Sequence, residues 1–402
     1  MASIPNATCG TRGALELLVV QATPFCNLDC AYCYLPNRSS TARMTEATLG
    51  RLFESVFSSP FVSDRLTVLW HAGEPLVAGI DYYRTVFDLI DRLNCANVRI
   101  THSVQTNGTL LDQHWIDFFR RHDVRIGVSL DGPPHLHDRY RRTRRGGGTC
   151  ESVLRAVRLL RHNDYPFHVI TVLTRESLSA ADALFRFYIE NGISDVAFNI
   201  EEIEGEHSRS SLQGVGLDEA VRSFFRDLLA LVESHPGKLA VREFSSVFGA
   251  IADPRAAEYG NPQTEPMRIV TVGVNGELST FSPELIESAS ARYKNFLFGN
   301  VHEGGLAGIT TRPNFADVCA DIRLGVEKCR QSCEYFELCL GGTPANKFFE
   351  NGGFDTTETL YCRLGKKALI DVALERLERA PRLKLSYGCA AAPPTESENC
   401  MT

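Results

Sequence analysis

Along residues 15–235, short apolar runs rich in β-branched residues alternate with segments whose apolar residues recur every three or four positions. The first pattern is typical of a buried strand and the second of an amphipathic helix. Residues 15–21 therefore predict a strand, and residues 45–57 predict a helix capped by Thr45. Further strands are predicted at 66–70, 98–105, 124–130, 167–174 and 196–200, and further helices at 81–93, 112–121, 150–161, 179–190 and 217–232.

These segments form six strand–helix units in succession. Right-handed crossovers between such units produce a parallel sheet. Because a closed barrel of this kind needs about eight units, the expected fold class is α/β, with a partial, TIM-like (β/α)6 barrel. The barrel is predicted to occupy residues 15–235, after an N-terminal extension of residues 1–14, and to end near Pro236.

The residues after 235 follow a different pattern. Residues 268–274 and 277–281 predict a hairpin, with Asn275 and Gly276 at its tight turn. Glycine-rich and cysteine-rich segments follow, with little periodicity before a predicted helix at 366–378. We therefore expect a small second domain at 236–365 and a C-terminal helix and tail at 366–402, disordered after Tyr387.

The composition is that of a soluble globular protein, because 44% of the 402 residues are apolar and 23% are charged. The net charge of −7 gives no general attraction to nucleic acid. No stretch approaches the ~20 apolar residues of a membrane span, and residues 1–13 lack the apolar segment of a signal peptide. We therefore expect a cytoplasmic protein that binds neither nucleic acid nor membranes.

The chain contains 13 cysteines, a large number for a protein without an export signal. In a reducing cytosol such residues are more often metal ligands or catalytic groups than disulfides. Cys26, Cys30 and Cys33 directly follow the first predicted strand, at the face where barrel enzymes place their chemistry. Three thiolates are one fewer than a [4Fe-4S] cluster generally takes, so one iron would stay open. The alternative is zinc, which would need a fourth local ligand, and the nearest histidine is His71.

The spacing Cys-x3-Cys-x2-Cys, with Tyr32 before the last cysteine, resembles the radical S-adenosylmethionine (SAM) superfamily. The resemblance implies that the open iron binds the amino and carboxylate groups of SAM. One electron then cleaves SAM to methionine and a 5′-deoxyadenosyl radical, which abstracts a hydrogen atom. In such enzymes the cofactors carry the difficult chemistry and the protein supplies orientation.

Polar motifs at the ends of later predicted strands carry the same resemblance. Residues 71–75 resemble the family's Gly-Gly-Glu-Pro motif, with Ala72 in place of the first glycine. The Glu74 carboxylate would suit the SAM ammonium group, and the resemblance assigns Ser129 to the SAM ribose and Arg141 to its carboxylate. The predicted SAM-binding residues are Tyr32, Ala72, Gly73, Glu74, Gln105, Asn107, Ser129, Arg141 and, at the adenine, Asn199.

A second set of cysteines comprises Cys329, Cys333, Cys339 and Cys362. Four thiolates fully ligate a [4Fe-4S] cluster, and a structural zinc ion is the alternative. The region resembles the SPASM extension of radical SAM enzymes that modify peptides and proteins. Full SPASM domains hold two auxiliary clusters, but here the cysteines expected for the nearer one are missing from the hairpin and from the stretch after Cys339. The predicted cofactors are therefore SAM and two [4Fe-4S] clusters, one radical and one auxiliary.

Residues 339–363 further resemble the Grr-type (glycine-rich repeat) radical SAM/SPASM maturases. These enzymes act on ribosomal precursor peptides, and related ones form three-residue cyclophanes by joining an aromatic ring carbon to a side-chain Cβ. The implied reaction removes a Cβ hydrogen, adds the carbon radical to the ring, and expels a proton and an electron, which the auxiliary cluster accepts. Glu284 is the candidate proton acceptor, and a flavodoxin or ferredoxin is the expected electron donor.

Several alternatives stay open. Thioether formation is one, and sulfatase-maturase-like peptide oxidation is another, although the Asp beside a hairpin Cys that serves those relatives as a base is absent here. A third alternative, from another class, is an iron–sulfur electron carrier or a non-catalytic peptide-binding scaffold. Glu74, Ser129 and Arg141 argue against it, because neither kind of protein needs a SAM-binding site. A separate peptide-recognition domain would need ~80 residues before the barrel, whereas the N-terminal extension comprises only residues 1–14. We therefore expect the leader peptide to bind to the barrel or to the C-terminal part. Pairing with an edge strand is one possible mode of binding.

Overall fold

The computed structural model describes residues 14–379. The expectations for the N-terminal extension lie almost entirely outside this range, and the expectation for the tail after Tyr387 lies wholly outside it.

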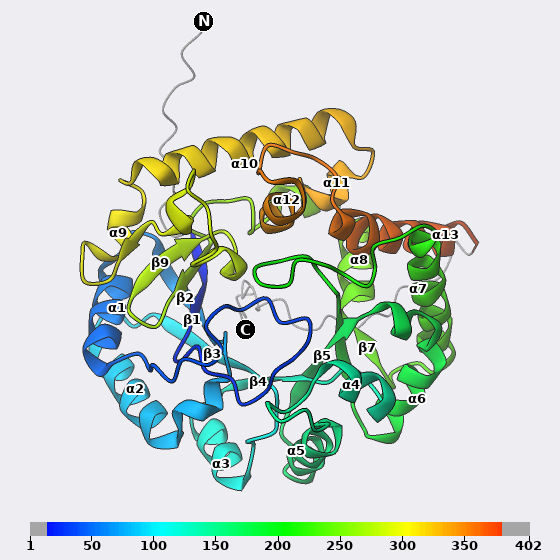
Figure 1. Ribbon diagram of the computed structural model, residues 1–402, viewed down its shortest axis with the longest axis horizontal. Coiled ribbons are helices and arrows are strands. Elements are labelled where there is room, and N and C mark those ends of the chain that lie inside the picture. The colour runs from blue at the N-terminus through cyan, green and yellow to red at the C-terminus, as the bar shows by residue number, and fades with distance from the viewer. Residues whose placement is uncertain (1–13, 380–402) are drawn as a thin grey trace, which may run out of the picture.

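The fold is built on one ten-stranded sheet in the order β10-β9-β8-β1-β2-β3-β4-β5-β6-β7. From β1 to β7 each strand pairs in parallel with the next. In Figure 1 the strands surround the centre of the molecule and the helices surround the strands, which confirms the predicted α/β partial barrel. The strands are β1 (Leu15–Val20), β2 (Val62–Trp70), β3 (Arg99–Thr106), β4 (Arg125–Ser129), β5 (Phe167–Leu173), β6 (Asp195–Ile200), β7 (Ala240–Val241), β8 (Ile269–Val272), β9 (Glu277–Thr280) and β10 (Gly299–Asn300).

The sheet is longer than the six strands that the sequence predicts. At one end β7 pairs in parallel with β6. At the other end the predicted hairpin is confirmed as β8 and β9, and β8 pairs in parallel with β1. The hairpin turn is closed by a hydrogen bond from the Gly276 N–H to the Gly273 carbonyl (2.9 Å), and Gly276 has a φ of +87°. The hairpin is therefore part of the same sheet as the barrel strands.

Helices cover the outer face of the barrel. Thr45 caps α1 by accepting a hydrogen bond from the Thr48 N–H (3.1 Å), and Asp112 caps α3 through the Trp115 N–H (3.1 Å), where the sequence predicts both helices to begin. The helix α4 was not predicted from the sequence, because its seven residues give too few turns for a periodic pattern. These helices are α1 (Glu46–Ser58), α2 (Ile80–Leu93), α3 (Gln113–Arg121), α4 (Pro134–Tyr140), α5 (Cys150–His162), α6 (Ala181–Glu190), α7 (Leu217–Ser234) and α8 (Arg242–Ala252).

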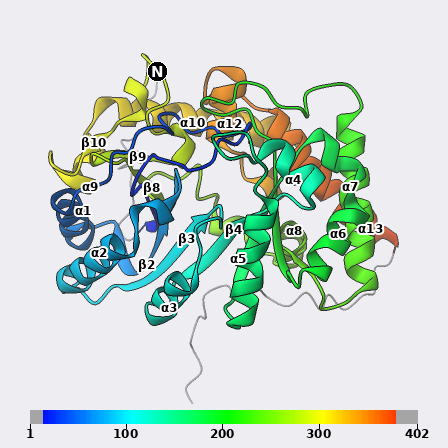
Figure 2. The ribbon, with the colours of Figure 1, turned by 60° about the horizontal axis from the view of Figure 1, so that its bottom comes forward.

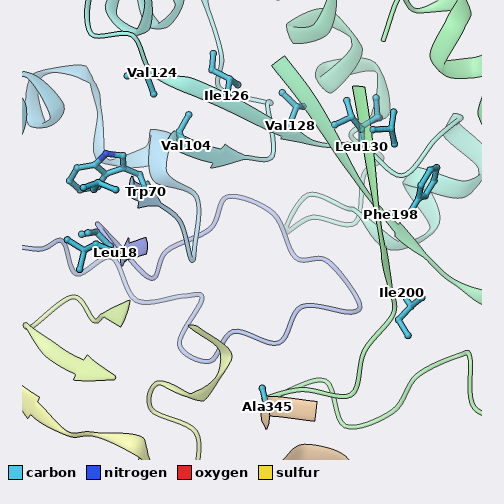
Figure 3. Packing of buried hydrophobic residues seen from close by; sticks show 14 of the residues in the cluster. Leu18, Trp70, Val104, Val124, Ile126, Val128, Leu130, Phe198, Ile200 and Ala345 are labelled. Carbon is cyan, nitrogen blue, oxygen red and sulfur yellow. The ribbon is translucent and has the colours of Figure 1, made fainter. Parts of the chain in front are cut away.

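Successive residues of the barrel strands face opposite sides of the sheet. Trp70 and Val104 point to the helices and are 1% and 3% exposed, and the Trp70 ring meets the Tyr83 ring of α2 at 5.3 Å. Figure 3 shows Trp70 and Val104 on neighbouring strands. Their strand neighbours Leu69 and Gln105 instead line a cavity inside the barrel. The strands thus separate a packed outer layer from an open interior.

The chain beyond β10 is mainly helical, although the weak periodicity of its sequence predicts no helix there before residue 366. The longest of these helices, α10, buries a strip that includes Asn314 and Gly325. These residues interrupt the apolar pattern, which explains why the sequence did not reveal the helix. The predicted terminal helix is confirmed as α13, which follows a π-helical segment, η6 (Cys362–Lys367). The C-terminal helices are α9 (Gly305–Ile309), α10 (Pro313–Ser332), α11 (Phe336–Cys339), α12 (Pro344–Asn351) and α13 (Ala368–Arg379).

Two of the C-terminal helices lie over the barrel. In Figure 2, α10 and α12 are on the same side of the molecule as the dark blue loop that follows β1. α13 lies against α7, where Glu375 Oε2 accepts an ion-paired hydrogen bond from Arg226 Nε (3.1 Å). Within residues 14–379, none of the helices has both the length and the apolar character needed to span a bilayer.

Candidate active site

A cavity of about 510 Å³ lies at the carboxyl ends of the barrel strands. Barrel enzymes place their sites at this end, and the volume is within the range of small-molecule sites. The loop after β1 contributes Cys26, Cys30 and Cys33, while Glu74 and Arg141 come from later loops. The structure thus brings the first cysteine motif together with two residues predicted to bind SAM.

The three thiols lie on a loop that hydrogen bonds hold in place. The Cys33 N–H donates to the Cys30 carbonyl (3.2 Å), and Cys26 Sγ accepts from the Leu28 N–H (3.4 Å) and from Asn107 Nδ2 (3.8 Å). Burial raises the pKa of the Cys26 thiol to about 12 and also raises that of Cys30. Such thiols stay neutral unless a metal takes the place of the proton. With no fourth thiol among the described residues of the lining, this donor set fits a [4Fe-4S] cluster with one open iron.

Glu74 is 1% exposed and lies in the wall of the cavity. Its carboxylate accepts hydrogen bonds from the Leu76 N–H (3.0 Å), Thr106 Oγ1 (2.6 Å) and the Asn107 N–H (2.8 Å). Burial raises the pKa of Glu74, and these three donors oppose the rise. Because a carboxylate offers about four acceptor positions, one position remains for a cation such as the SAM ammonium group.

The turn that carries Glu74 comes very close to the cysteine loop. The Glu74 N–H donates to the Phe25 carbonyl (2.8 Å), and Ala72 and Gly73 both have positive φ angles, 68° and 79°. A Cβ atom at Gly73 would lie 2.3 Å from the Thr23 carbonyl oxygen. Gly73 lines the cavity, whereas Ala72 is buried outside the lining. The close backbone approach therefore requires glycine at position 73.

Replacing Gly73 by alanine is expected to lower the free energy of unfolding by about 2–4 kcal/mol, because the methyl group would clash with backbone atoms at a positive φ. Urea unfolding followed by circular dichroism measures the change. Gly50→Ala in α1 is the control, since nothing lies within 4 Å of a Cβ added there. An unfolding midpoint of the Gly73 variant equal to that of the wild type would contradict the close approach.

Arg141 is 8% exposed and also lines the cavity. Its Nη1 donates to the Tyr32 hydroxyl (2.9 Å), and that hydroxyl donates to Asp131 Oδ2. Burial raises the pKa of Asp131, and the Arg141 charge lowers it. The buried Arg141 Nε–H has no hydrogen-bond partner among residues 14–379. A buried guanidinium with a free donor fits an anionic ligand group such as the SAM carboxylate.

The remaining predicted SAM-binding residues are also in the lining. Gln105 Nε2 donates to Ser129 Oγ (3.0 Å), and Asn199 Oδ1 accepts from Arg242 Nη2 (2.7 Å). The structure thus brings Tyr32, Gly73, Glu74, Gln105, Asn107, Ser129, Arg141 and Asn199 to one cavity, without Ala72.

The cavity has an acidic side, most of which was not predicted from the sequence. Glu284, the predicted proton acceptor, lines the cavity and accepts a hydrogen bond from the Ser282 hydroxyl. A run of glutamates at 201–206, directly after β6, was the available sequence signal for the rest. Lining residues not predicted as site residues include Tyr34, His71, Glu202 and Glu204.

The second set of cysteines lines a small cavity of its own, and all four of its thiols take part. The nearly buried Lys347 (3% exposed) has its Nζ 3.4 Å from Cys329 Sγ. Burial raises the pKa of Cys339, and that of Cys362 to about 12. Cys319 is instead packed in the hydrophobic core. Four thiols beside a buried ammonium group fit an anionic [4Fe-4S] cluster. Iron analysis would distinguish such a cluster from the alternative, a structural zinc ion.

Across the part of the chain that the structure describes, no three Cys, His, Asp or Glu side chains are grouped closely enough to hold a single metal ion.

Comparison with known proteins gives the class. The sequence profile of the Radical SAM superfamily matches residues 20–188. A protein of Synechocystis sp., sll1766, described as uncharacterised, is 39% identical over 382 residues, which is 94% of this chain and 96% of that protein. The chain belongs to the radical SAM superfamily.

Other matches are to a protein named for its activity and to structures solved with bound ligands. The serine-type anaerobic sulfatase-maturating enzyme of Klebsiella aerogenes is 32% identical over 200 residues, so this chain spans only 49% of that protein. The solved structure of anSMEcpe with bound AdoMet and the Cp18Cys peptide superposes with a TM-score of 0.74 at 21% identity, covering 91% of this chain and 98% of that one. Streptococcus suis SuiB bound to the precursor peptide SuiA gives a TM-score of 0.62 at 16% identity, over 87% and 76% of the two chains. At these identities the two structures support the fold alone.

Proposed function

We propose that this radical SAM enzyme modifies a ribosomal precursor peptide by joining an aromatic ring carbon to the Cβ of a nearby residue, which forms a cyclophane. The observation that carries the proposal is a single cavity in which three thiols, Glu74 and Arg141 meet a group of carboxylates. The three thiols, Glu74 and Arg141 suit the binding of SAM and its cluster. The carboxylates suit proton transfer and substrate binding. A separate four-thiol cavity would hold one auxiliary cluster.

The cavity wall supplies the ligands that the cofactors need. Cys26, Cys30 and Cys33 would hold the radical [4Fe-4S] cluster, while Glu74 and Arg141 would hold the ammonium and carboxylate groups of SAM. When bound, these cofactors supply a 5′-deoxyadenosyl radical that removes one hydrogen atom from the substrate. Because Glu74 and Arg141 are almost fully buried, they are positioned before SAM binds and little reorganisation is needed.

Closing the ring removes two hydrogens from the peptide. The first leaves Cβ as a hydrogen atom, and the second leaves the aromatic ring as a proton and an electron. Glu284 is the proposed proton acceptor, because it lines the cavity and burial raises its pKa towards the range suited to a general base. Cys329, Cys333, Cys339 and Cys362 would hold the auxiliary cluster that takes the electron, and a flavodoxin or ferredoxin is the proposed reductant of the radical cluster.

Under the same proposal, each part of the chain has its own role in cofactor binding. Residues 15–235 would bind SAM and its cluster, residues 236–365 would bind the auxiliary cluster, and residues 366–402 would follow as a C-terminal segment. The pairing of β8 with β1 joins the first two parts in one sheet, so a fixed distance between the two thiol sets is expected.

A peptide substrate is supported by the relatives. The Klebsiella aerogenes relative is named as a sulfatase-maturating enzyme, and two structural neighbours were solved with peptides bound. The same relatives favour a second candidate, oxidation of a Ser or Cys side chain in a sulfatase. Against it, β9 (Glu277–Thr280) contains neither a cysteine nor an aspartate. Thioether formation would require a cysteine-rich substrate.

Co-expression with the peptide encoded by the neighbouring short reading frame tests the proposal. We expect a loss of about 2 Da per crosslink, together with 5′-deoxyadenosine in anaerobic assays. Tandem mass spectrometry should place the bond between an aromatic residue and the Cβ of a nearby one. A bond to sulfur would favour thioether formation, and oxidation of a sulfatase peptide without a crosslink would favour the second candidate. No 5′-deoxyadenosine from the reconstituted enzyme would exclude all three reactions.

A further inference from the structure

We infer that the acidic side of the cavity is a binding subsite for a cationic side chain, lysine or arginine, of the substrate peptide. The inference rests on the proposed peptide-modifying function, because the cation must be delivered into the same cavity as the hydrogen donor. It concerns Glu202, Glu204 and Glu284, which all line the cavity. We call these three residues the carboxylate group.

The carboxylate group is assembled from two parts of the chain that are distant in sequence, and a residue from a third part holds it together. Glu202 and Glu204 follow β6, and Glu284 lies in the short turn after β9. Asn346 of α12 ties the first two together, because its Nδ2 donates to Glu202 Oε2 (2.7 Å) and to Glu204 Oε1 (3.3 Å). In Figure 3, Ile200 and Ala345 mark the ends of β6 and α12 that carry these residues. The group is thus built by the fold, unlike a row of acids on a surface helix.

No cation within residues 14–379 is paired with this group. Burial first, and then the charges of Glu202 and Glu284, raises the pKa of Glu204, while burial raises the pKa of Glu202 to about 7 and also raises that of Glu284. The group therefore tends to hold protons near neutral pH, and a cation placed beside it would favour the ionised carboxylates. None of the ion pairs formed within residues 14–379 includes a residue of the carboxylate group. Glu204 is buried, and Glu202 and Glu284 are half-buried. Ionised carboxylates in such surroundings are costly without a cation, so a bound cation would stabilise this arrangement.

Two cations in the same region are engaged elsewhere. Arg242 Nη2 pairs with Glu243 Oε1 (2.5 Å) and also binds Asn199. Lys366 Nζ lies over the Tyr361 ring, 5.7 Å from its centre, which is a cation–π distance. Neither side chain is among the hydrogen-bond donors to the carboxylate group.

A separate observation also indicates a missing donor. Asn346 is completely buried, yet its Oδ1 accepts no hydrogen bond from residues 14–379. The unpaired oxygen belongs to the same amide that bridges Glu202 and Glu204. A buried acceptor beside two carboxylates calls for a group with several N–H donors. An ammonium or guanidinium group has such donors and carries the charge that the carboxylates require.

The test measures binding without turnover. The anaerobically reconstituted enzyme with SAM, and without reductant, is titrated by calorimetry with four tripeptide amides, acetyl-Trp-Gly-X-amide, in which X is lysine, arginine, norleucine or glutamate. We expect the lysine and arginine probes to bind about 10-fold to 100-fold more tightly than the norleucine probe. A preference for only one of the two cationic probes would identify the side chain that the subsite takes.

The double variant Glu202→Gln/Glu204→Gln is expected to bind the lysine, arginine and norleucine probes with affinities within about threefold of one another. Glutamine keeps the shape of the side chains, and Glu284→Gln provides a second variant should the double variant fail to fold. Glu206→Gln is the matched control, because Glu206 lies on the same loop but is exposed. It should keep the full preference for cationic probes.

Equal binding of the lysine, arginine and norleucine probes by the wild type would overturn the inference. So would a cation preference that survives in both the double variant and Glu284→Gln, or no detectable binding of cationic probes at about 5 mM. Failure of the proposed function is seen separately, as an absence of 5′-deoxyadenosine and of peptide products. An enzyme that makes crosslinks while lacking the preference would contradict the subsite alone.

Discussion

The Cys30→Ala variant is expected to lose the radical cluster and, with it, reductive cleavage of SAM by at least about 10³-fold. Among residues 14–379, Cys30 is one of three thiols that line the main cavity. Two thiols cannot hold a cluster that generally needs three or four ligands. The measurements are iron content after anaerobic reconstitution, expected to fall from about eight atoms per chain to about four, and 5′-deoxyadenosine by chromatography.

Cys95→Ala is the control for this experiment, because Cys95 is exposed and distant from both thiol sets in the sequence. It should keep the iron content and the SAM cleavage of the wild type. A Cys30 variant that still forms 5′-deoxyadenosine at a wild-type rate would show that the first motif does not carry the radical cluster.

The Cys339→Ala variant is expected to separate the two clusters. It should lose about four iron atoms, keep 5′-deoxyadenosine formation within about threefold, and lose crosslinked peptide by more than about 100-fold. The physical reason is that the four thiols line a cavity apart from the SAM site. Radical formation would therefore persist, whereas the last electron would lose its acceptor.

Cys319→Ala serves as the control for the auxiliary site. Cys319 is buried on α10 but is not in the lining of the four-thiol cavity. The control should keep about eight iron atoms, at some cost in stability. A wild-type enzyme with about four iron atoms and one zinc ion would instead favour the zinc alternative. Unchanged crosslinking by the Cys339 variant would contradict any role of this site in the reaction.

Much of the fold follows from local sequence patterns. The strands and helices of residues 15–234 recur with clear periods, and Thr45 and Asp112 cap helices where the sequence predicts. The cysteine motif and Glu74 could be placed at one end of the barrel, because parallel strands bring their carboxyl ends together. A local pattern was therefore sufficient for the elements and for the edge of the sheet that holds the site.

The remaining features depend on contacts between distant residues. The pairing of β8 with β1 is a tertiary contact that the local sequence of neither strand predicts. α10 buries Asn314 because the Asn314 side-chain amide donates to the Tyr293 and Leu297 carbonyls, so a polar residue stands where the apolar pattern expects a hydrophobic one. Of the carboxylate group, Glu284 was predicted from the sequence, whereas Glu202 and Glu204 were not. Their local sequence is that of a solvated loop, and only the contact with Asn346 of α12 shows that they belong to a site.

The alternation of side chains along the barrel strands separates two kinds of evolutionary change. Outward residues such as Trp70 and Val104 hold the helices, and a change there alters stability. Inward residues such as Ser103 and His168 line the cavity. Descendants of one ancestral barrel can therefore exchange the inward positions and acquire new substrates while the outer layer stays the same. Such a scaffold is open to divergence at the site without a matching loss of fold.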